Sequence, residues 1–413
     1  MSISSYMEKL LDGVEVEWKV LAELGELVRG NGLPKTDFTD TGVPAIHYGQ
    51  IYTHYGLSTE TTLSFVSPET AKKLKKVDTG DVVITNTSEN LDDVGKALVY
   101  LGEQQAVTGG HATIFKPSKL IIGKYFAYFT QTSTFFSAKR KLAKGTKVID
   151  VSATDMAKIQ IPIPCPDNPE KSLAIQAEIV RILDAFTAMT AELTAELTAE
   201  LNMRKKQYNY YRGQLLSFEE GDVEWKTLGD LAENLDSKRK PITSGLREAG
   251  EIPYYGASGI VDYVKDYIFD GDYLLVSEDG ANLLARNTPI AFSISGKTWV
   301  NNHAHVLKFE TYAERKYVEY YLNSIDLTPY ISGAAQPKLN KKNLESINIP
   351  NPAPKEKERI VAILDKFDSL TCSIKEGLPR EIELRQKQYE YYRDLLLSFP
   401  ASPAGGPKSD EAA

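Results

Sequence analysis

The sequence contains no complete copy of the common catalytic motifs that we searched for. The segment "SGKTW" at 295–299 resembles the end of a phosphate-binding loop, but the position of its first required glycine is Ala291. There is no GxGxxG after a predicted strand, no GxSxG, and no Asn-Pro-Pro-aromatic motif. His303 and His305 would share one strand face, without a carboxylate or cysteine at ligand spacing. We therefore expect no catalytic residue and no metal site.

Basic residues gather locally, although the chain has a net charge of −8. Residues 116–147 contain no acid, and hydroxyl and aromatic side chains are interspersed among their lysines. A solvated helix face is the simpler explanation, but such patches also bind phosphates irrespective of sequence. The candidates for DNA contact are Lys116, Lys119, Lys124, Lys139, Arg140, Lys141, Lys144, Lys147, Lys238, Arg239, Lys240, Lys338, Lys341 and Lys342.

A second set of candidates lies in two nearly identical segments, "QYNYYRGQLLSF" at 207–218 and "QYEYYRDLLLSF" at 388–399. Their tyrosines and arginines suit either coiled-coil packing or contact with two copies of one partner protein. The candidates for partner binding are Tyr208, Tyr211, Arg212, Tyr389, Tyr392 and Arg393.

The elements that carry these residues begin with "TAELTAELTAEL" at 190–201. Ala, Glu and Leu favour helix, and a period of four keeps Leu193, Leu197 and Leu201 nearly in line. The apolar stripe predicts a helix over about 174–218, and 360–396 continues the same pattern. Gly377 and Pro379 predict a kink or break in this second helix. The tail from Pro400 should be disordered.

Several segments of the first half of the chain are repeated in the second half. "IVRILDAF" at 179–186 returns as "IVAILDKF" at 360–367, with the same offset of 181 residues as the tyrosine segments. "VEWKVLAEL" at 16–24 returns at 223–231, "IQIPIP" at 159–164 returns as "INIPNP" at 347–352, and His111 aligns with His303. Joining the end of the chain to its start would make both halves equivalent, as in a pseudo-twofold dimer.

The regions between these repeats mix strand and helix signals. "GDVVITNT", "KALVYLG" and "GDYLLVSED" resemble strands, whereas "KYFAYFTQTSTFFSAKRKL" and "ERKYVEYYLNSI" predict one helix each. The composition, 42% apolar and 25% charged, is that of a globular protein, and the longest apolar runs are too short to span a membrane. Two cysteines suit a reducing cytoplasm.

With its repeated helices, circular order and tyrosine segments, the whole chain resembles the specificity subunit of a type I restriction–modification enzyme, and the TAEL repeat is similar to that of the type IC branch. The resemblance implies an α+β fold, in which two α/β target recognition domains are separated by two long antiparallel coiled-coil helices. It implies the following divisions: recognition domains at 1–157 and 219–346, conserved helical regions at 158–218 and 347–399, and a tail at 400–413.

The resemblance also implies partners and cofactors. Each domain would read one half of a split target in double-stranded DNA, and the helices would bind two modification subunits. These subunits would use S-adenosylmethionine to methylate adenine N6, and restriction subunits would use ATP and Mg for translocation and cleavage. This chain would hold no cofactor itself.

The TAEL repeat suggests a spacer. One unit adds about 6 Å of helix, or one to two base pairs, so the number of units could set the unread gap between half-sites. Two alternatives remain: a coiled-coil adaptor that binds two proteins and no DNA, and an enzyme with an unrecognised site.

Overall fold

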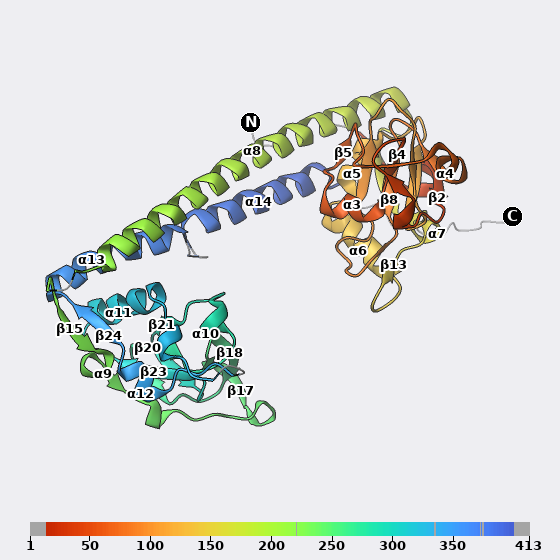
Figure 1. Ribbon diagram of the computed structural model, residues 1–413. Helices are drawn as coiled ribbons and strands as arrows, with labels where there is room; N and C mark the ends of the chain where they lie inside the picture. Colours follow the sequence, from red (N-terminus) through yellow and green to blue (C-terminus); the bar gives the residue numbers. More distant parts are fainter. Residues whose placement is uncertain (1–13, 220, 334–335, 372, 374–375, 400–413) are drawn as a thin grey trace. The chain divides into compact units, whose positions relative to one another are not determined.

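The chain folds into two compact units, which are described separately. The computed structural model describes residues 14–219, 221–333, 336–371, 373 and 376–399. One unit comprises the described residues of 1–195 and 383–413, and the other those of 196–382 (Figure 1). Each unit contains one α/β domain and parts of the long helices, because each domain packs against a different stretch of them. The predicted tail lies outside the described residues.

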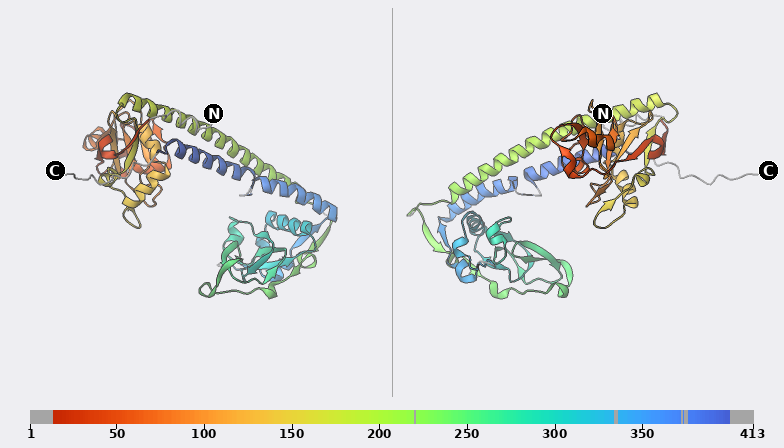
Figure 2. Two further views of the ribbon diagram at one scale, coloured as in Figure 1. Left: turned by 180° about the vertical axis from the view of Figure 1, so that it is seen from behind. Right: turned by 45° about the vertical axis from the view of Figure 1, so that its right-hand side comes forward.

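The longest element is helix α8, Pro169–Leu216, which is unbroken over 48 residues (Figures 1 and 2). It begins earlier than predicted because Pro169 occupies the first helical position, where the missing N–H costs nothing, and because Asn168 Oδ1 accepts the Lys171 N–H at 3.0 Å. At 1.5 Å per residue, α8 is about 72 Å long. The three TAEL leucines are half-buried along one line of it.

The second helical region is interrupted, as predicted. Helix α13, Pro354–Thr371, ends before α14, Gly377–Leu396, begins. Gly377 has a φ of +78°, and a Cβ there would collide with the carbonyl oxygens of Ser369 and Leu370. Pro379 lies in the first turn of α14, where proline is tolerated.

Helix α8 pairs with α14 and α13 in the antiparallel sense. In the first unit, the rings of Phe186 and Tyr392 lie 6.1 Å apart. In the second, Tyr211 stacks on Phe367 at 5.6 Å. Residue numbers rise along α8 while they fall along its partners, so the predicted coiled-coil arrangement is confirmed.

The first domain contains two five-stranded sheets. In spatial order, the first sheet is β2 (Gly25–Arg29), β12 (Ala112–Pro117), β8 (Val82–Thr85), β10 (Ala97–Tyr100) and β5 (Ser58–Thr59). The second is β3 (Phe38–Thr39), β6 (Ser64–Val66), β4 (Val43–Ile46), β11 (Ala106–Thr108) and β7 (Lys75–Val77). Strand β8 is entirely buried, as expected of "VVIT" in the middle of a sheet. A further ladder joins β9 (Thr87–Ser88) to β13 (Ile149–Asp150).

The helices of the first domain are short: α2 (Leu21–Leu24), α3 (Tyr48–Thr53), α4 (Pro68–Lys73), α5 (Gly123–Phe129), α6 (Ser133–Leu142), α7 (Ala153–Met156) and the 3-10 turn η1 (Lys35–Asp37). The prediction of one helix over "KYFAYFTQTSTFFSAKRKL" is wrong, since α5 and α6 are separate. The Thr132 side chain accepts the Phe135 N–H at 3.2 Å and so begins a new helix.

The second domain is built from two four-stranded sheets. The first is β16 (Glu233–Asn234), β23 (Ala304–Lys308), β20 (Tyr273–Ser277) and β21 (Ala291–Ile294). The second is β18 (Gly259–Val264), β17 (Ala249–Gly256), β22 (Lys297–Val300) and β19 (Phe269–Asp270). Its helices are α9 (Leu228–Leu231), α10 (Asn282–Ala285), α11 (Tyr312–Ser324) and α12 (Lys341–Glu345), with 3-10 turns η2 (Asp236–Lys238), η3 (Ser244–Leu246) and η4 (Thr328–Tyr330). Helix α11 confirms the prediction for "ERKYVEYYLNSI".

The sequence repeats occupy equivalent places. Strand β1 (Val16–Val20) pairs with β14 (Gln160–Pro164), and β15 (Glu224–Thr227) pairs with β24 (Asn348–Asn351). Trp18 faces Pro162 in the first ladder, and Trp225 faces Pro350 in the second. Each domain is therefore closed by its first strand and the strand that precedes its long helix. The predicted five-part division of the chain remains a prediction, although β14 and β24 begin close to its boundaries at 158 and 347.

Equivalent helix residues also anchor each domain. Ile179 and Leu183 are buried in the core of the first unit, as Ile360 and Leu364 are in that of the second. No helix within the described ranges has both the length and the apolar character needed to cross a membrane.

A carboxylate follows each of these apolar pairs. Asp184 accepts the Tyr128 hydroxyl at 2.7 Å, and Asp365 accepts the Tyr320 hydroxyl at 2.6 Å. The two aspartates lie at the repeat offset of 181 residues. The duplicated sequence therefore encodes one docking mode, used twice.

Candidate nucleic-acid interface

Several of the predicted DNA-contacting residues have carboxylate partners inside their own domain. Lys116 lies 2.8 Å from Asp78 and 2.7 Å from Asp81. The remaining pairs of this kind are Lys124–Asp184, Lys144–Asp155, Arg239–Asp236, Arg239–Glu278, Lys338–Glu278 and Lys341–Glu345. Of these cations, Lys144, Lys338 and Lys341 are nevertheless exposed and can still attract a phosphate.

Lys139 requires a correction. Its side chain is only 4% exposed, and its ammonium donates to the carbonyl oxygen of Val94 at 2.5 Å. Burial lowers the pKa of Lys139 to about 8. Because α6 turns this residue inward, towards the loop before β10, Lys139 serves the domain core and is not available to DNA.

The other predicted cations remain open to solvent. They are exposed and have no ion pair with any described carboxylate: Lys119, Arg140, Lys141, Lys147, Lys238, Lys240 and Lys342. They lie on loops or helix ends, from which flexible side chains can follow a backbone of phosphates.

The predicted partner-binding tyrosines divide into packed and exposed residues. Tyr208 is buried against Phe367, and the Tyr389 hydroxyl lies 3.0 Å from the Thr187 hydroxyl, so both hold helices together. Arg212 and Arg393 lie over the rings of Tyr208 and Tyr389, respectively.

The most exposed aromatic residues of these segments were not predicted. Tyr210 is 63% exposed and Tyr391 is 64% exposed. Each packs edge-on against the next tyrosine, Tyr211 or Tyr392, with 5.4 Å between ring centroids. Tyr210 and Tyr391 lie at the offset of 181 residues, so the repeat itself contained the signal that identifies them.

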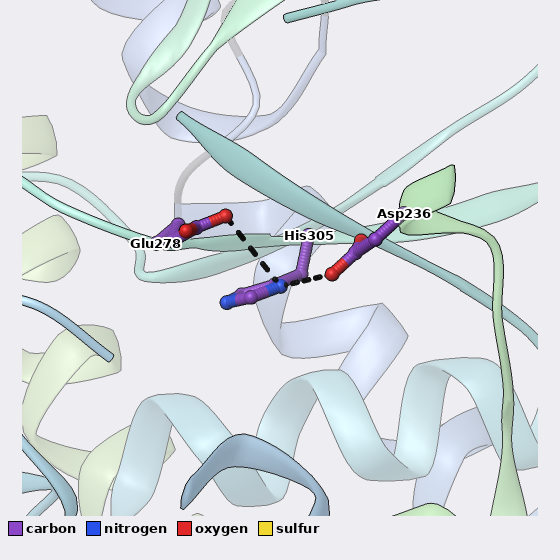
Figure 3. Close-up of side chains that lie close together, drawn as sticks. All are labelled: Asp236, Glu278 and His305. Carbon is purple, nitrogen blue, oxygen red and sulfur yellow. Dashed lines mark hydrogen bonds and ion pairs between the residues drawn. The ribbon is translucent and has the colours of Figure 1, made fainter. Parts of the chain in front are cut away.

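A buried polar network lies at the end of strands β20 and β23 in the second domain. Figure 3 shows the ring of His305, 1% exposed, between the carboxylates of Asp236 and Glu278. Nε2 donates to the carbonyl oxygen of Leu339 at 2.7 Å, and Nδ1 lies 2.6 Å from Asp236. Both ring nitrogens therefore face oxygen acceptors, a carboxylate on one side and a carbonyl on the other.

Arg239 completes this network. Its guanidinium donates to Glu278 at 2.6 Å and lies 3.3 Å from Asp236. Burial alone raises the pKa of Asp236, but the hydrogen bond from His305 and nearby positive charge outweigh burial and lower it. The pKa of Glu278 is likewise raised by burial and lowered on balance by Arg239, His305 and Lys338. Two buried anions are thus matched by cations.

The ligand atoms of Asp236, Glu278 and His305 lie within 4.8 Å of one another, a spacing that a metal ion could bridge. A metal needs a free lone pair on the imidazole, whereas both ring nitrogens of His305 are hydrogen-bonded. Arg239 also lies against both carboxylates. The cluster is therefore an ion-pair network. Sequence reasoning missed its carboxylates, because they lie 69 and 27 residues away from His305.

The first domain has an uncharged counterpart. Asn86 follows β8 as Glu278 follows β20, and Thr113 occupies on β12 the place of His305 on β23. The Thr113 hydroxyl donates to Asn86 Oδ1 at 2.8 Å, and Asn86 Nδ2 donates to the Val151 carbonyl oxygen at 2.8 Å. Both domains therefore hold the end of a central strand with polar contacts, which are buried and neutral in the first domain and part-buried and charged in the second.

Comparison with known proteins gives a consistent result over most of the chain. Residues 14–203 and 220–384 match the family described as "Type I restriction modification DNA specificity domain". The chain is 40% identical over 428 residues to the EcoR124I/EcoR124II specificity subunit of Escherichia coli, covering 97% of this chain and 98% of that one. It is 37% identical over 391 residues to the EcoprrI specificity subunit of Escherichia coli, covering 91% and 93%.

The fold has a counterpart among solved structures. A chain from a structural study of assembly and conformational transition in the type I R-M system superposes with a TM-score of 0.62 at 15% identity, covering 92% of this chain and 97% of that one.

Proposed function

Because this chain belongs to the family of type I restriction–modification DNA specificity subunits, we propose that its two domains read the two halves of a split target in double-stranded DNA. The observation that carries this proposal is the duplication: two domains of unlike sequence stand on equivalent ladders and helix anchors. The two domains are attached to the helices in the same way but differ in sequence, as expected if each domain reads a different half-site. The adaptor hypothesis is not favoured, since the family is defined by DNA specificity.

The exposed cations supply the affinity in this proposal. Lys119, Arg140, Lys141 and Lys147 in the first domain, and Lys238, Lys240 and Lys342 in the second, would contact phosphates and release counterions. Binding should weaken steeply with added salt. Replacing one of them by glutamine should weaken binding to all sequences alike and reduce the salt dependence by about one phosphate contact.

As a member of this family, the chain is a non-catalytic subunit. Catalysis is proposed to reside in its partners: two modification subunits that use S-adenosylmethionine to methylate adenine N6, and restriction subunits that use ATP and Mg. The exposed Tyr210 and Tyr391, at equivalent places in the two helical segments, suit two copies of one modification subunit. Aromatic side chains in such positions commonly dominate binding energy.

The test is single-base mapping of adenine methylation in cells that express this chain with its modification subunit. Methylation confined to one split motif is expected, and the same map gives both half-sites and the gap. Cells that express the modification subunit alone are the control. If methylation were identical without this chain, the proposal would fail.

A further inference from the structure

The two domains share one backbone frame around His111 and His303. In the first, β8 pairs with β12 so that Thr85 faces Ala112; in the second, β20 pairs with β23 so that Ser277 faces Ala304. Just beyond these pairs, the Asn86 N–H donates to the His111 carbonyl oxygen at 2.8 Å, and the Glu278 N–H donates to that of His303 at 2.9 Å. The two strand ends are thus equivalent residue by residue, at an offset of 192.

At each strand end an exposed histidine contacts one hydrogen-bonding partner, and that partner is 33% exposed for Asp279 but only 8% exposed for Thr87. In the first domain, His111 is exposed and its Nδ1 lies 2.9 Å from the Thr87 hydroxyl. In the second, His303 is 51% exposed and its Nδ1 lies 2.9 Å from the Asp279 carboxylate, which is 33% exposed. The histidine is retained while its partner differs, so the same position offers different hydrogen-bonding groups in the two domains.

Buried groups fix the residue immediately before each partner. Asn86 precedes Thr87 and is held by Thr113 and Val151. Glu278 precedes Asp279 and is held by Arg239 and Lys338. Such fully satisfied networks hold a strand end in one conformation, which hydrogen-bond readout of a base requires.

The basic segments predicted to contact phosphates lie beside both pairs. Asp150, three residues after the exposed Lys147, pairs with Thr87 across the β9–β13 ladder. In the second domain, Lys338 forms a backbone bridge with Asp279, and Lys341 and Lys342 follow at the start of α12. In each domain, candidate phosphate-binding residues therefore lie next to a candidate base-reading pair. A sequence-specific interface needs both, because phosphate contacts fix the position of the protein on DNA and base contacts read the sequence.

We propose that Thr87–His111 and Asp279–His303 are equivalent base-reading pairs, one for each half-site. This inference rests on the proposed DNA-reading function and adds the specificity-determining residues. Asp279 can only accept hydrogen bonds when ionised, and after binding His303 it keeps lone pairs for the exocyclic amine of cytosine or adenine. In the first domain the exposed group is His111, whose ring the buried Thr87 hydroxyl orients, so this domain has a different preference at the equivalent base pair.

The test uses the complex of this chain with its modification subunit. Bound sequences are selected from a random DNA pool and read for the wild type, Asp279→Asn, His303→Gln and Thr87→Val. Asp279→Asn gains donors without changing shape. We expect the first two variants to reduce the preference at one position of one half-site by about 10- to 100-fold, and Thr87→Val to do so in the other half-site.

Asp262→Asn is the matched control. Asp262 is a carboxylate of the same domain, 43% exposed on β18 and paired with Arg247, and its variant should leave every letter unchanged. Unchanged letters in all three test variants would overturn the inference. So would equal loss of binding to all sequences in folded Asp279→Asn and His303→Gln, since that is the behaviour of phosphate contacts. If wild-type complex selected no motif, the proposed function itself would fail.

Discussion

The imidazole of His305 forms hydrogen bonds at both ring nitrogens and connects the buried polar network of the second domain. Its nitrogens face a buried carboxylate and a buried carbonyl oxygen. His303, two residues earlier on the same chain, is exposed. The pair shows how burial, and not residue type, separates a structural histidine from one available to a ligand.

Replacing His305 by alanine should therefore destabilise the second domain strongly. Two carboxylates would stay buried with Arg239 as their main remaining counter-charge, and losing one member of such a network costs about 3–5 kcal/mol. Chemical denaturation of the two proteins measures the change. His303→Ala is the control and should alter the free energy of unfolding by less than about 0.5 kcal/mol, because its side chain is half exposed. Equal effects from both would contradict the assigned network.

The same network predicts acid sensitivity. The pKa values of Asp236 and Glu278 are lowered in the folded protein, so both bind protons more weakly than in the unfolded chain. Their contribution to stability is present above their unfolded pKa values, near 4, and is lost as the pH falls through the folded values. Unfolding free energies measured between pH 7 and pH 3 should fall more steeply below about pH 4.5 for the wild type than for His305→Ala. Parallel curves would speak against the linkage.

At the scale of single elements, α8 gains its length from a repeat unit of about one helical turn. Deleting one TAEL unit removes about 6 Å of helix and rotates the remainder by only about 40°, so the apolar stripe stays nearly aligned. We expect the unread gap in the methylated motif to shorten by one to two base pairs while the letters stay the same. Deleting Glu196 alone, which rotates the stripe by about 100°, should instead impair folding. Changed letters after the four-residue deletion would refute the spacer hypothesis.

The start of α14 depends on the backbone conformation of one glycine, Gly377. Gly377→Ala would force a left-handed φ on a residue with a Cβ and push that atom into two carbonyl oxygens, at a cost of about 1–3 kcal/mol. Gly213→Ala is the opposite case, because Gly213 lies inside α8 and the position that its Cβ would occupy is open space, so this change should stabilise the protein by about 0.5–1 kcal/mol. Thermal unfolding should show a lower melting temperature for Gly377→Ala and a higher one for Gly213→Ala than for the wild type. A stabilising Gly377→Ala would show that the positive φ is not required.

At the scale of the whole molecule, the duplication predicts stoichiometry. Tyr210→Ala or Tyr391→Ala alone should reduce the modification subunits bound to each chain from two to one, and the double variant should bind none. Sedimentation with purified modification subunit measures this directly. Tyr208→Phe, which keeps the buried ring, is the control. If the double variant still bound two modification subunits, Tyr210 and Tyr391 would not form the interface with them.

The sequence alone determined the plan of this protein. Helix repeats at one constant offset, together with domain segments that repeat at other offsets, indicate two domains on equivalent helices. Helix periodicity predicts α8, and Gly377 and Pro379 predict the break before α14. These features are local or repetitive, so they can be read without knowing which distant residues meet. The same holds for the basic segments, whose composition is visible in the sequence.

Only the tertiary structure decided which of these residues are available and which chemistry they form. Lys139 is predicted as a DNA contact but turns inward, and Tyr210 and Tyr391 are the most exposed tyrosines of their segments. Asp236, Glu278 and His305 meet only because β16, β20 and β23 lie in one sheet. Strand pairing joins residues far apart in the chain, and side-chain burial depends on that pairing, so neither follows from spacing in the sequence.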